Sequence, residues 1–158
     1  MYSTTVPCRI TNGFNIVFNT WSEVEEVLDA FNMFMRSLAR PEPGLEEYGD
    51  VAIFSIARGG VVISMNWSME GGKYVLERFG IEFSDEYCDS GHCRIVYPVN
   101  RVYDPRERGL INRGLARLAS AIEDSGDTTK YVIGSIVITL ERVGNTLKTI
   151  TLEVDCPN

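Results

Sequence analysis

The chain has 158 residues, which fits one domain with a hydrophobic core of its own. Hydrophobic residues make up 44% and charged residues 23%, so the composition argues against disorder, collagen-like repeats and coiled coils. The 15 basic and 22 acidic residues leave a formal net charge of -7, which disfavours nucleic acid and anionic membranes as partners. No apolar run reaches the length of a membrane span, and the first ten residues lack a signal-peptide pattern, so we expect a cytoplasmic protein.

The polar composition is skewed, with twelve arginines, three lysines, one histidine and no glutamine. Absent glutamine fits selection at high temperature, whereas a GC-rich genome alone explains the arginine bias equally well. The four cysteines suggest two pairs, Cys8 with Cys156 near the two ends and Cys88 with Cys93 across a polar loop. Disulfides without a signal peptide point to the cytosol of a thermophile, and four reduced thiols are the alternative.

The first half of the chain reads as strands around one helix. Asn12-Gly13 separates two short β-prone runs and predicts an opening hairpin. Thr20 or Ser22 then caps a helix that we expect to run to about Arg40, where prolines stop it. Two strands follow at 50–57 and 61–67. The segment 73–83 is ambiguous between helix and strand, and we favour strand for 78–83.

The second half repeats this order. A β-rich run spans 93–99, and Asp104 with Pro105 predicts the start of a second helix whose buried stripe extends to Ile122. The segments 130–142 and 146–154 then form a long hairpin over Gly144-Asn145.

This order predicts an α+β fold, a mainly antiparallel sheet with two helices packed on one face. Because the order is hairpin, helix, hairpin, and then the same again, we expect one domain with a duplicated unit, its halves at 1–68 and 73–158. The alternative is an α+β sandwich whose elements alternate without duplication.

The loop from Tyr87 to Cys93 holds the only histidine beside two of the four cysteines. Cys88, His92 and Cys93 could supply three ligands to a zinc ion, although their spacing matches no common zinc motif. We therefore expect no metal and no cofactor, and favour a Cys88–Cys93 disulfide. A cysteine nucleophile with His92 as its base is weaker still, because no group that would orient the histidine is identifiable.

The segment 101–117 is basic within an acidic protein. Arg106, Arg113 and Arg117 have helical spacing that places them on one face, where guanidinium groups could bind phosphate or carboxylate. The alternative is a solvated helix face paired with nearby acids.

The chain lacks a recognisable catalytic constellation, which favours a non-enzymatic role. The leading hypothesis is a small interaction protein, such as a viral or mobile-element accessory protein or inhibitor, or a self-assembling component. A flat face carrying Met33 and Trp67 would support this hypothesis, and open sheet edges predict a homodimer. The competing hypothesis is an anionic-ligand-binding domain, or an unorthodox enzyme, that uses the arginine cluster.

Overall fold

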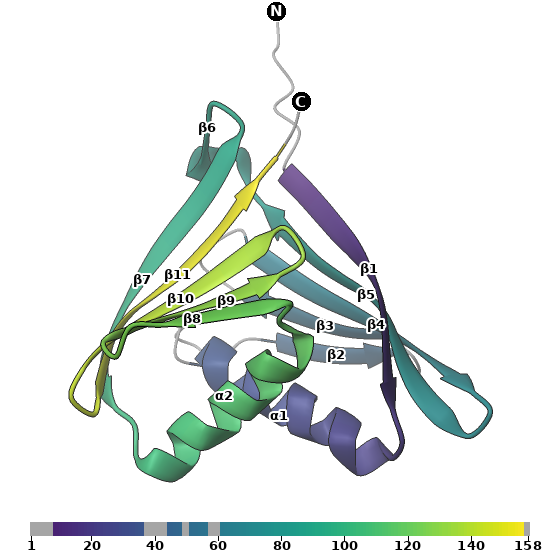
Figure 1. Ribbon diagram of the computed structural model, residues 1–158. Coiled ribbons are helices and arrows are strands. Elements are labelled where there is room, and N and C mark those ends of the chain that lie inside the picture. The colour runs from purple at the N-terminus through teal and green to yellow at the C-terminus, as the bar shows by residue number, and fades with distance from the viewer. Residues whose placement is uncertain (1–7, 37–43, 49–50, 57–60, 157–158) are drawn as a thin grey trace, which may run out of the picture.

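The computed structural model describes residues 8–36, 44–48, 51–56 and 61–156 (Figure 1). The predicted α+β class, the antiparallel pairing and the two helices are confirmed. Within these ranges no helix is both long and apolar enough to cross a membrane. In chain order the elements are β1 (Cys8–Phe18), α1 (Trp21–Arg36), β2 (Gly44–Tyr48), β3 (Val51–Ile56), β4 (Val61–Glu70), β5 (Lys73–Phe83), the 3-10 turn η1 (Asp85–Tyr87), β6 (Cys88–Asp89), β7 (His92–Val102), α2 (Pro105–Leu118), β8 (Ala121–Asp124), β9 (Thr128–Ile133), β10 (Ile136–Val143) and β11 (Thr146–Asp155).

The strands form two antiparallel sheets rather than the single sheet we expected. Sheet A has the order β1-β5-β4-β3-β2, and sheet B has the order β6-β7-β11-β10-β9-β8. In sheet A, α1 carries the chain from β1 to the opposite edge, and four strands then return to pair with β1. In sheet B, α2 links β7 to β8, and four strands return to β7 in the same way. The two halves of the chain therefore share one connectivity.

The expected boundary between the halves, at 68–73, needs correction. Gly71 and Gly72 have positive φ angles of 58° and 77° and form the turn that joins β4 to β5 within sheet A. Two successive positive φ angles are those of a tight hairpin turn, so this turn connects paired strands. The change from sheet A to sheet B comes after Phe83, the last residue of β5. The internal duplication itself stays a prediction.

The opening hairpin at Asn12-Gly13 is absent, because residues 8–18 form one strand. β1 pairs with β5 from Cys8 to Phe18, with a register shift between Gly13 and Ile16. The Asn-Gly pair thus lies at an irregularity within the strand, where pairing with β5 overrides the local preference for a turn.

Two further boundaries differ in the second half. Ile122 lies on β8, after the end of α2, and its side chain is exposed rather than part of the helix stripe. The segment 130–142 is two strands, β9 and β10, joined at Gly134-Ser135. The hairpin of β10 with β11 over Gly144-Asn145 is confirmed.

Other local predictions agree with the structure. Val61, Ile63, Met65 and Trp67 alternate on the buried side of β4. The whole of 73–83 is the strand β5. Before α1, the Thr20 carbonyl and hydroxyl oxygens accept hydrogen bonds from the Glu23 amide, and the Glu23 carboxylate accepts one from the Asn19 amide. The predicted helix end near Arg40 lies outside the described residues.

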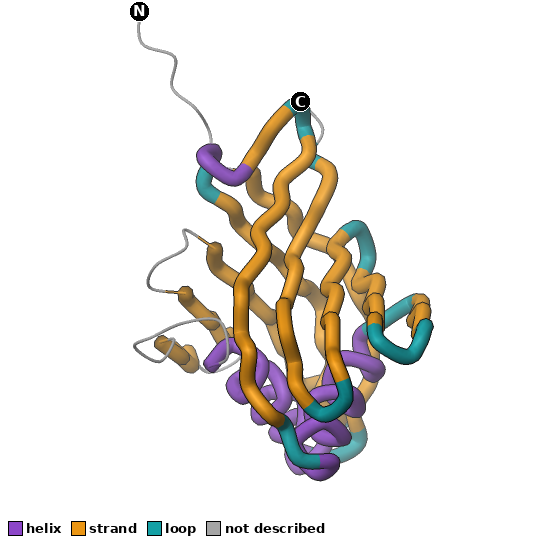
Figure 2. The backbone as a smooth tube through the Cα atoms, turned by 90° about the vertical axis from the view of Figure 1, so that its left-hand side faces the viewer, coloured by secondary structure: helices purple, strands orange, loops and turns teal. Residues whose placement is uncertain are grey.

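The two sheets lean together near the start of β1 and the end of β11, and they diverge at the other end, where α1 and α2 lie (Figure 1). A view onto sheet B shows both helices gathered at that wider end (Figure 2). Cys8 and Cys156 form a disulfide that joins the first strand of sheet A to the end of sheet B. A single hydrophobic cluster contains residues from both sheets and both helices, so the core fills the space between them.

Candidate anion-binding cleft

The start of α2 positions the candidate site. Pro105 occupies the first turn, and the Asp104 carboxylate accepts a hydrogen bond from the Glu107 amide at 2.8 Å, as the sequence predicted. The start of the helix is therefore set by the cap. Residues 105, 108, 109 and 112 then fall on one side of α2, because residues three and four apart share a helix face.

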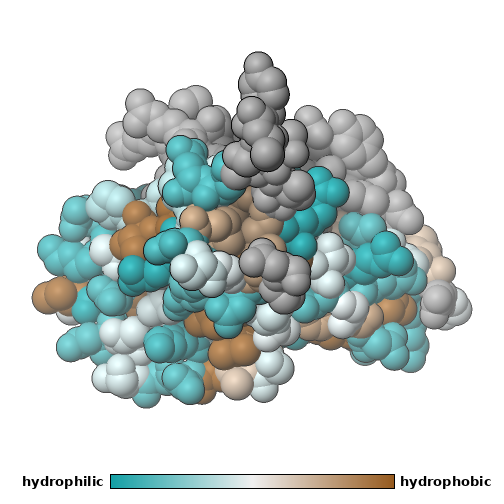
Figure 3. Space-filling view, turned by 90° about the horizontal axis from the view of Figure 1, so that it is seen from above, coloured by the Kyte–Doolittle hydropathy of each residue, from teal (hydrophilic) through white to brown (hydrophobic). Residues whose placement is uncertain are grey.

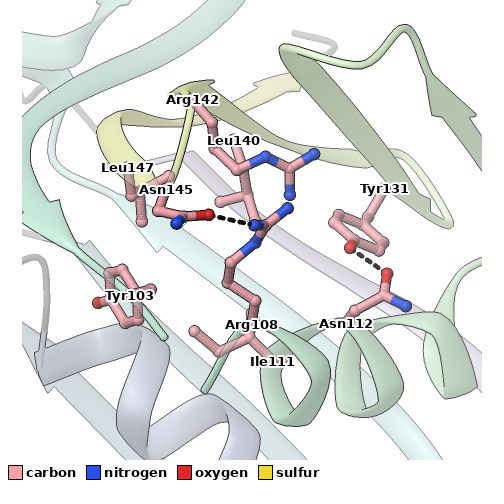
Figure 4. Close-up of a pocket in the computed structure, with 9 residues that line it drawn as sticks. All are labelled: Tyr103, Arg108, Ile111, Asn112, Tyr131, Leu140, Arg142, Asn145 and Leu147. Atoms are coloured by element: carbon pink, nitrogen blue, oxygen red, sulfur yellow. Dashed lines mark hydrogen bonds between the residues drawn. The ribbon is translucent and has the colours of Figure 1, made fainter. Parts of the chain in front are cut away.

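That side of α2 forms a cleft with sheet B. The cleft has a volume of about 400 Å³ and is lined by Pro105, Arg108, Gly109, Asn112, Asp124, Thr129 and Arg142. A narrower recess of about 20 Å³ adjoins it and shares Arg108, Asn112 and Arg142 with the cleft. The other residues of the recess are mainly apolar or aromatic: Tyr103, Ile111, Tyr131, Leu140, Asn145 and Leu147. Figure 4 shows Arg108, from α2, and Arg142, from β10, extending into the same space.

Both arginines of the cleft are half-buried, and both are held by neutral groups. The Arg108 guanidinium donates a hydrogen bond to the Asn145 side-chain oxygen at 3.0 Å. The Arg142 guanidinium donates to the Thr129 hydroxyl at 2.8 Å and to the Gly126 carbonyl at 3.2 Å. The ion pairs among the described residues, at a limit of 4.0 Å, involve other arginines and His92. Two positive charges therefore meet in one cleft without a carboxylate partner in the described chain.

An aromatic residue lies beside these charges. Tyr131 is buried, and its hydroxyl donates a hydrogen bond to the Asn112 side-chain oxygen. Burial raises the pKa of Tyr131, the positive charge of Arg142 opposes this rise, and the negative charge of Asp124 adds to it. The side chains of Arg142 and Asp124 are thus both close enough to act electrostatically on one hydroxyl group.

The arginines that the sequence singled out lie elsewhere. Arg113 and Arg117 each contact the Glu26 carboxylate of α1 at 3.3 Å, so these two form an ion-pair network between the helices. Arg106 is exposed and lies outside the cleft lining. Arg113 and Arg117 thus share one carboxylate, which agrees with the alternative that this helix face is paired with nearby acids. Arg106 is not part of this network.

A sequence signal for Arg108 and Arg142 was present and was missed. Arg108 precedes Ile111 by three and Leu115 by seven residues, so it lies on the buried stripe of α2. Arg142 continues the inward series Ile136, Ile138 and Leu140 on β10. An arginine that continues a series of buried positions indicates a charge that is held inside or at the rim of a cavity.

The cysteine and histidine loop forms disulfide and ion-pair contacts. Cys88 and Cys93 lie opposite each other on β6 and β7 and are bonded, with their Cα atoms 4.0 Å apart. A zinc site using Cys88, His92 and Cys93 therefore lacks its thiolates, and the described residues contain no cluster of metal ligands. The His92 ring contacts the Asp155 carboxylate at 2.8 Å and the Glu153 carboxylate at 3.2 Å.

The two interface candidates do not form an open face. Trp67 is buried, and its ring lies 5.1 Å from that of Phe18. Met33 is partly buried against the core. On the face seen in Figure 3, hydrophobic residues occur as separate small areas among hydrophilic ones. An interaction surface built on Trp67 would thus require the core to open.

Comparison with known proteins finds no matching family model, no similar curated protein and no similar solved structure.

Proposed function

We propose that the protein binds a small anionic molecule in the cleft between α2 and sheet B. The observation that carries the proposal is the pair Arg108 and Arg142, two half-buried guanidinium groups in one cleft whose hydrogen-bond partners are all neutral. Like charges held close together repel each other, and a bound anion relieves that repulsion. Guanidinium groups bind carboxylate and phosphate oxygens through paired N–H donors, which makes these the expected anionic groups.

The lining of the cleft favours binding over catalysis. Among the residues that line the cleft and its recess, Asp124 is the one carboxylate, and histidine, lysine and cysteine are absent. The Thr129 hydroxyl already accepts a hydrogen bond from Arg142. The chain therefore supplies charge, hydrogen-bond donors and a small apolar recess, which together suit recognition of a ligand.

The experiment is a thermal-shift and calorimetric screen of the purified chain against phosphate, pyrophosphate, acetate and dicarboxylates. A ligand at about 100 times its Kd stabilises the fold by roughly 2.7 kcal/mol, which raises the Tm measurably. Arg108→Ala should abolish the shift, and Arg142→Lys, which keeps the charge but loses the planar fork, should weaken it. Arg106→Ala is the matched control, because it removes the same charge from the exposed side of the same helix. Equal responses of the Arg108 and Arg106 variants would refute the proposal.

We also propose self-association as a homodimer, and a separate surface favours it. Val102 and Val143 flank Thr146 in the register of sheet B, and their side chains are 66% and 64% exposed. A two-fold contact would place the same patch on both copies and cover four valines at once. Light scattering coupled to size exclusion tests this, with Val102→Lys expected to give the monomer mass. The monomer mass for the unmodified chain across a hundredfold dilution would exclude the dimer.

A further inference from the structure

The cleft contains a negative charge as well as two positive ones. Asp124, at the end of β8, lines the cleft opposite the helix residues. Its carboxylate accepts a hydrogen bond from the Gly126 amide at 2.9 Å, which holds it in the turn before β9. The ion pairs of the described residues do not include it. One acid and two arginines thus share a cavity without neutralising one another directly.

The register of sheet B shows how these charges are arranged. Asp124 lies opposite Thr129 in the pairing of β8 with β9, so both side chains are on the same face of the sheet. The Thr129 hydroxyl is in turn the acceptor for Arg142. Asp124 and Arg142 therefore both lie beside Thr129, Asp124 as its partner on β8 and Arg142 through its side chain, which also contacts the carbonyl of Gly126, and their charged groups are more than 4.0 Å apart. Their common electrostatic effect on Tyr131 agrees with this placement.

From this arrangement we propose that the ligand carries two negative charges and one ammonium group, the class that contains acidic amino acids and aminoalkyl phosphates. The anionic groups lie against Arg108 and Arg142, and the ammonium group lies against Asp124. This inference rests on the proposed anion-binding role of the cleft and specifies its ligand.

The balance of charge favours this class over a simple anion. The two arginines and Asp124 give the cleft a formal charge of +1, and a dianion with one ammonium group carries -1, so each charged group finds an opposite partner. A dianion without an ammonium group would leave Asp124 facing a second negative charge. An ammonium group beside a carboxylate forms a charge-assisted hydrogen bond, which is stronger than a neutral one.

The test uses calorimetry with two matched pairs of probes, glutamate against glutarate and phosphoethanolamine against ethyl phosphate. The first pair reports on carboxylates and the second on phosphates. In each pair the two members differ only by the amine. In the pair that binds more tightly, the ratio of the two Kd values therefore measures the contribution of the ammonium contact. We expect the amine-bearing member to bind about tenfold more tightly, the ratio that a charge-assisted hydrogen bond supplies.

The variant Asp124→Asn should remove this preference, with the two Kd values then within about twofold. Its side-chain oxygen can still accept the Gly126 hydrogen bond, so the turn is retained. Glu123→Gln is the matched control, because Glu123 is the preceding acid on β8 and lies outside the cleft lining. It should keep the tenfold preference.

The outcomes separate the inference from the proposed function. Equal Kd values within each pair, or a preference that survives Asp124→Asn, would overturn the ammonium contact while leaving anion binding in place. An absence of binding by all four probes and by simple anions would overturn both.

Discussion

Gly114 of α2 lies so close to Ala30 of α1 that a Cβ atom on Gly114 would overlap the Ala30 Cβ atom. Both residues are buried, and the helices meet at this point. The absence of a side chain at Gly114 is what permits the helices to approach, because any larger residue must push α1 away. This contact also sets the position of α2, whose other side lines the cleft.

Gly114→Ala should therefore destabilise the fold. Overpacking typically costs about 1–3 kcal/mol, whereas alanine in place of glycine gains about 1 kcal/mol in helix propensity, so we expect a net loss. Denaturant unfolding measures it. Gly109→Ala is the control on the same helix, because a Cβ there meets only the end of the flexible Arg113 side chain. A Gly114 variant as stable as the Gly109 variant would show that the helix contact is loose.

His92 gives a prediction about pH. Its hydrogen bond with Asp155 is the largest effect on its pKa and raises it, burial lowers it, and the Glu153 contact raises it again, with a net pKa above 6.5. Stabilisation from the protonated ring is present below pH 6.5, the unfolded value, and is lost as the pH rises through the folded value. Since the ring is exposed, the effect on stability is about 0.2–1 kcal/mol.

The His92 titration can be followed by NMR without assignment, because the chain has one histidine. Asp155→Asn should lower the pKa of His92 more than Glu153→Gln does, since the Asp155 contact is the larger cause. The reverse order would mean that the ring faces Glu153 in solution.

Tyr97, which is partly buried, and Tyr131, which is buried, differ in the hydrogen bonds of their hydroxyl groups. The Tyr97 hydroxyl is buried without a hydrogen-bond partner among the described residues, whereas Tyr131 donates to Asn112. Tyr97→Phe should therefore leave the free energy of unfolding equal or higher, and Tyr131→Phe should lower it by about 1 kcal/mol. Urea unfolding of the two variants measures the contrast, and a comparable loss in both would reveal a partner for Tyr97.

Tyr97 also predicts behaviour at high pH. Burial, and to a smaller extent the charge of Tyr87, raises the pKa of Tyr97 to about 12 from 10.0. The unfolded chain loses this proton near pH 10 while the folded chain keeps it, so stability should fall as the pH rises from 10 to about 12. The wild-type loss of stability in this range should exceed that of Tyr97→Phe.

The disulfides should contribute unequally to stability. Cys8–Cys156 closes a sequence separation of 148 and Cys88–Cys93 one of 5, so the chain-entropy relation gives about 5 and about 2 kcal/mol. Cys8→Ser should thus lower the unfolding midpoint more than Cys88→Ser. Intact mass after alkylation without reductant measures the pairing directly. Ready alkylation of all four sulfurs in the folded protein would show that neither bond forms.

Several features could be predicted from the sequence because they depend on near neighbours. The Asp104-Pro105 start of α2 is a local cap, and the alternation of Val61, Ile63 and Met65 needs only the pleat of one strand. The two cysteine pairs were predicted on a different ground, the even number of cysteines and their positions, because Cys8 and Cys156 are 148 residues apart while Cys88 and Cys93 are 5 apart.

The site required the tertiary structure. Glu26 of α1 forms ion pairs with Arg113 and Arg117 of α2. The helical spacing of the two arginines places them on one face but does not reveal this partner on another helix. Arg108 and Arg142 become neighbours only when β10 is placed beneath α2. The sequence shows that both arginines continue series of buried residues. It does not show that neither arginine has a carboxylate partner among the described residues.

The strand β1 also depends on a partner that is distant in the sequence. Asn12-Gly13 has the local preference of a turn, yet β1 continues through it because the residues from Cys8 to Gly13 and from Ile16 to Phe18 pair with β5. The amino-acid sequence by itself determined the two helices, most of the strand segments and the cap of α2, since these follow from interactions a few residues apart. Strand partners and the ion-pair partners of the arginines were decided by the tertiary structure, because they depend on which distant segments lie side by side.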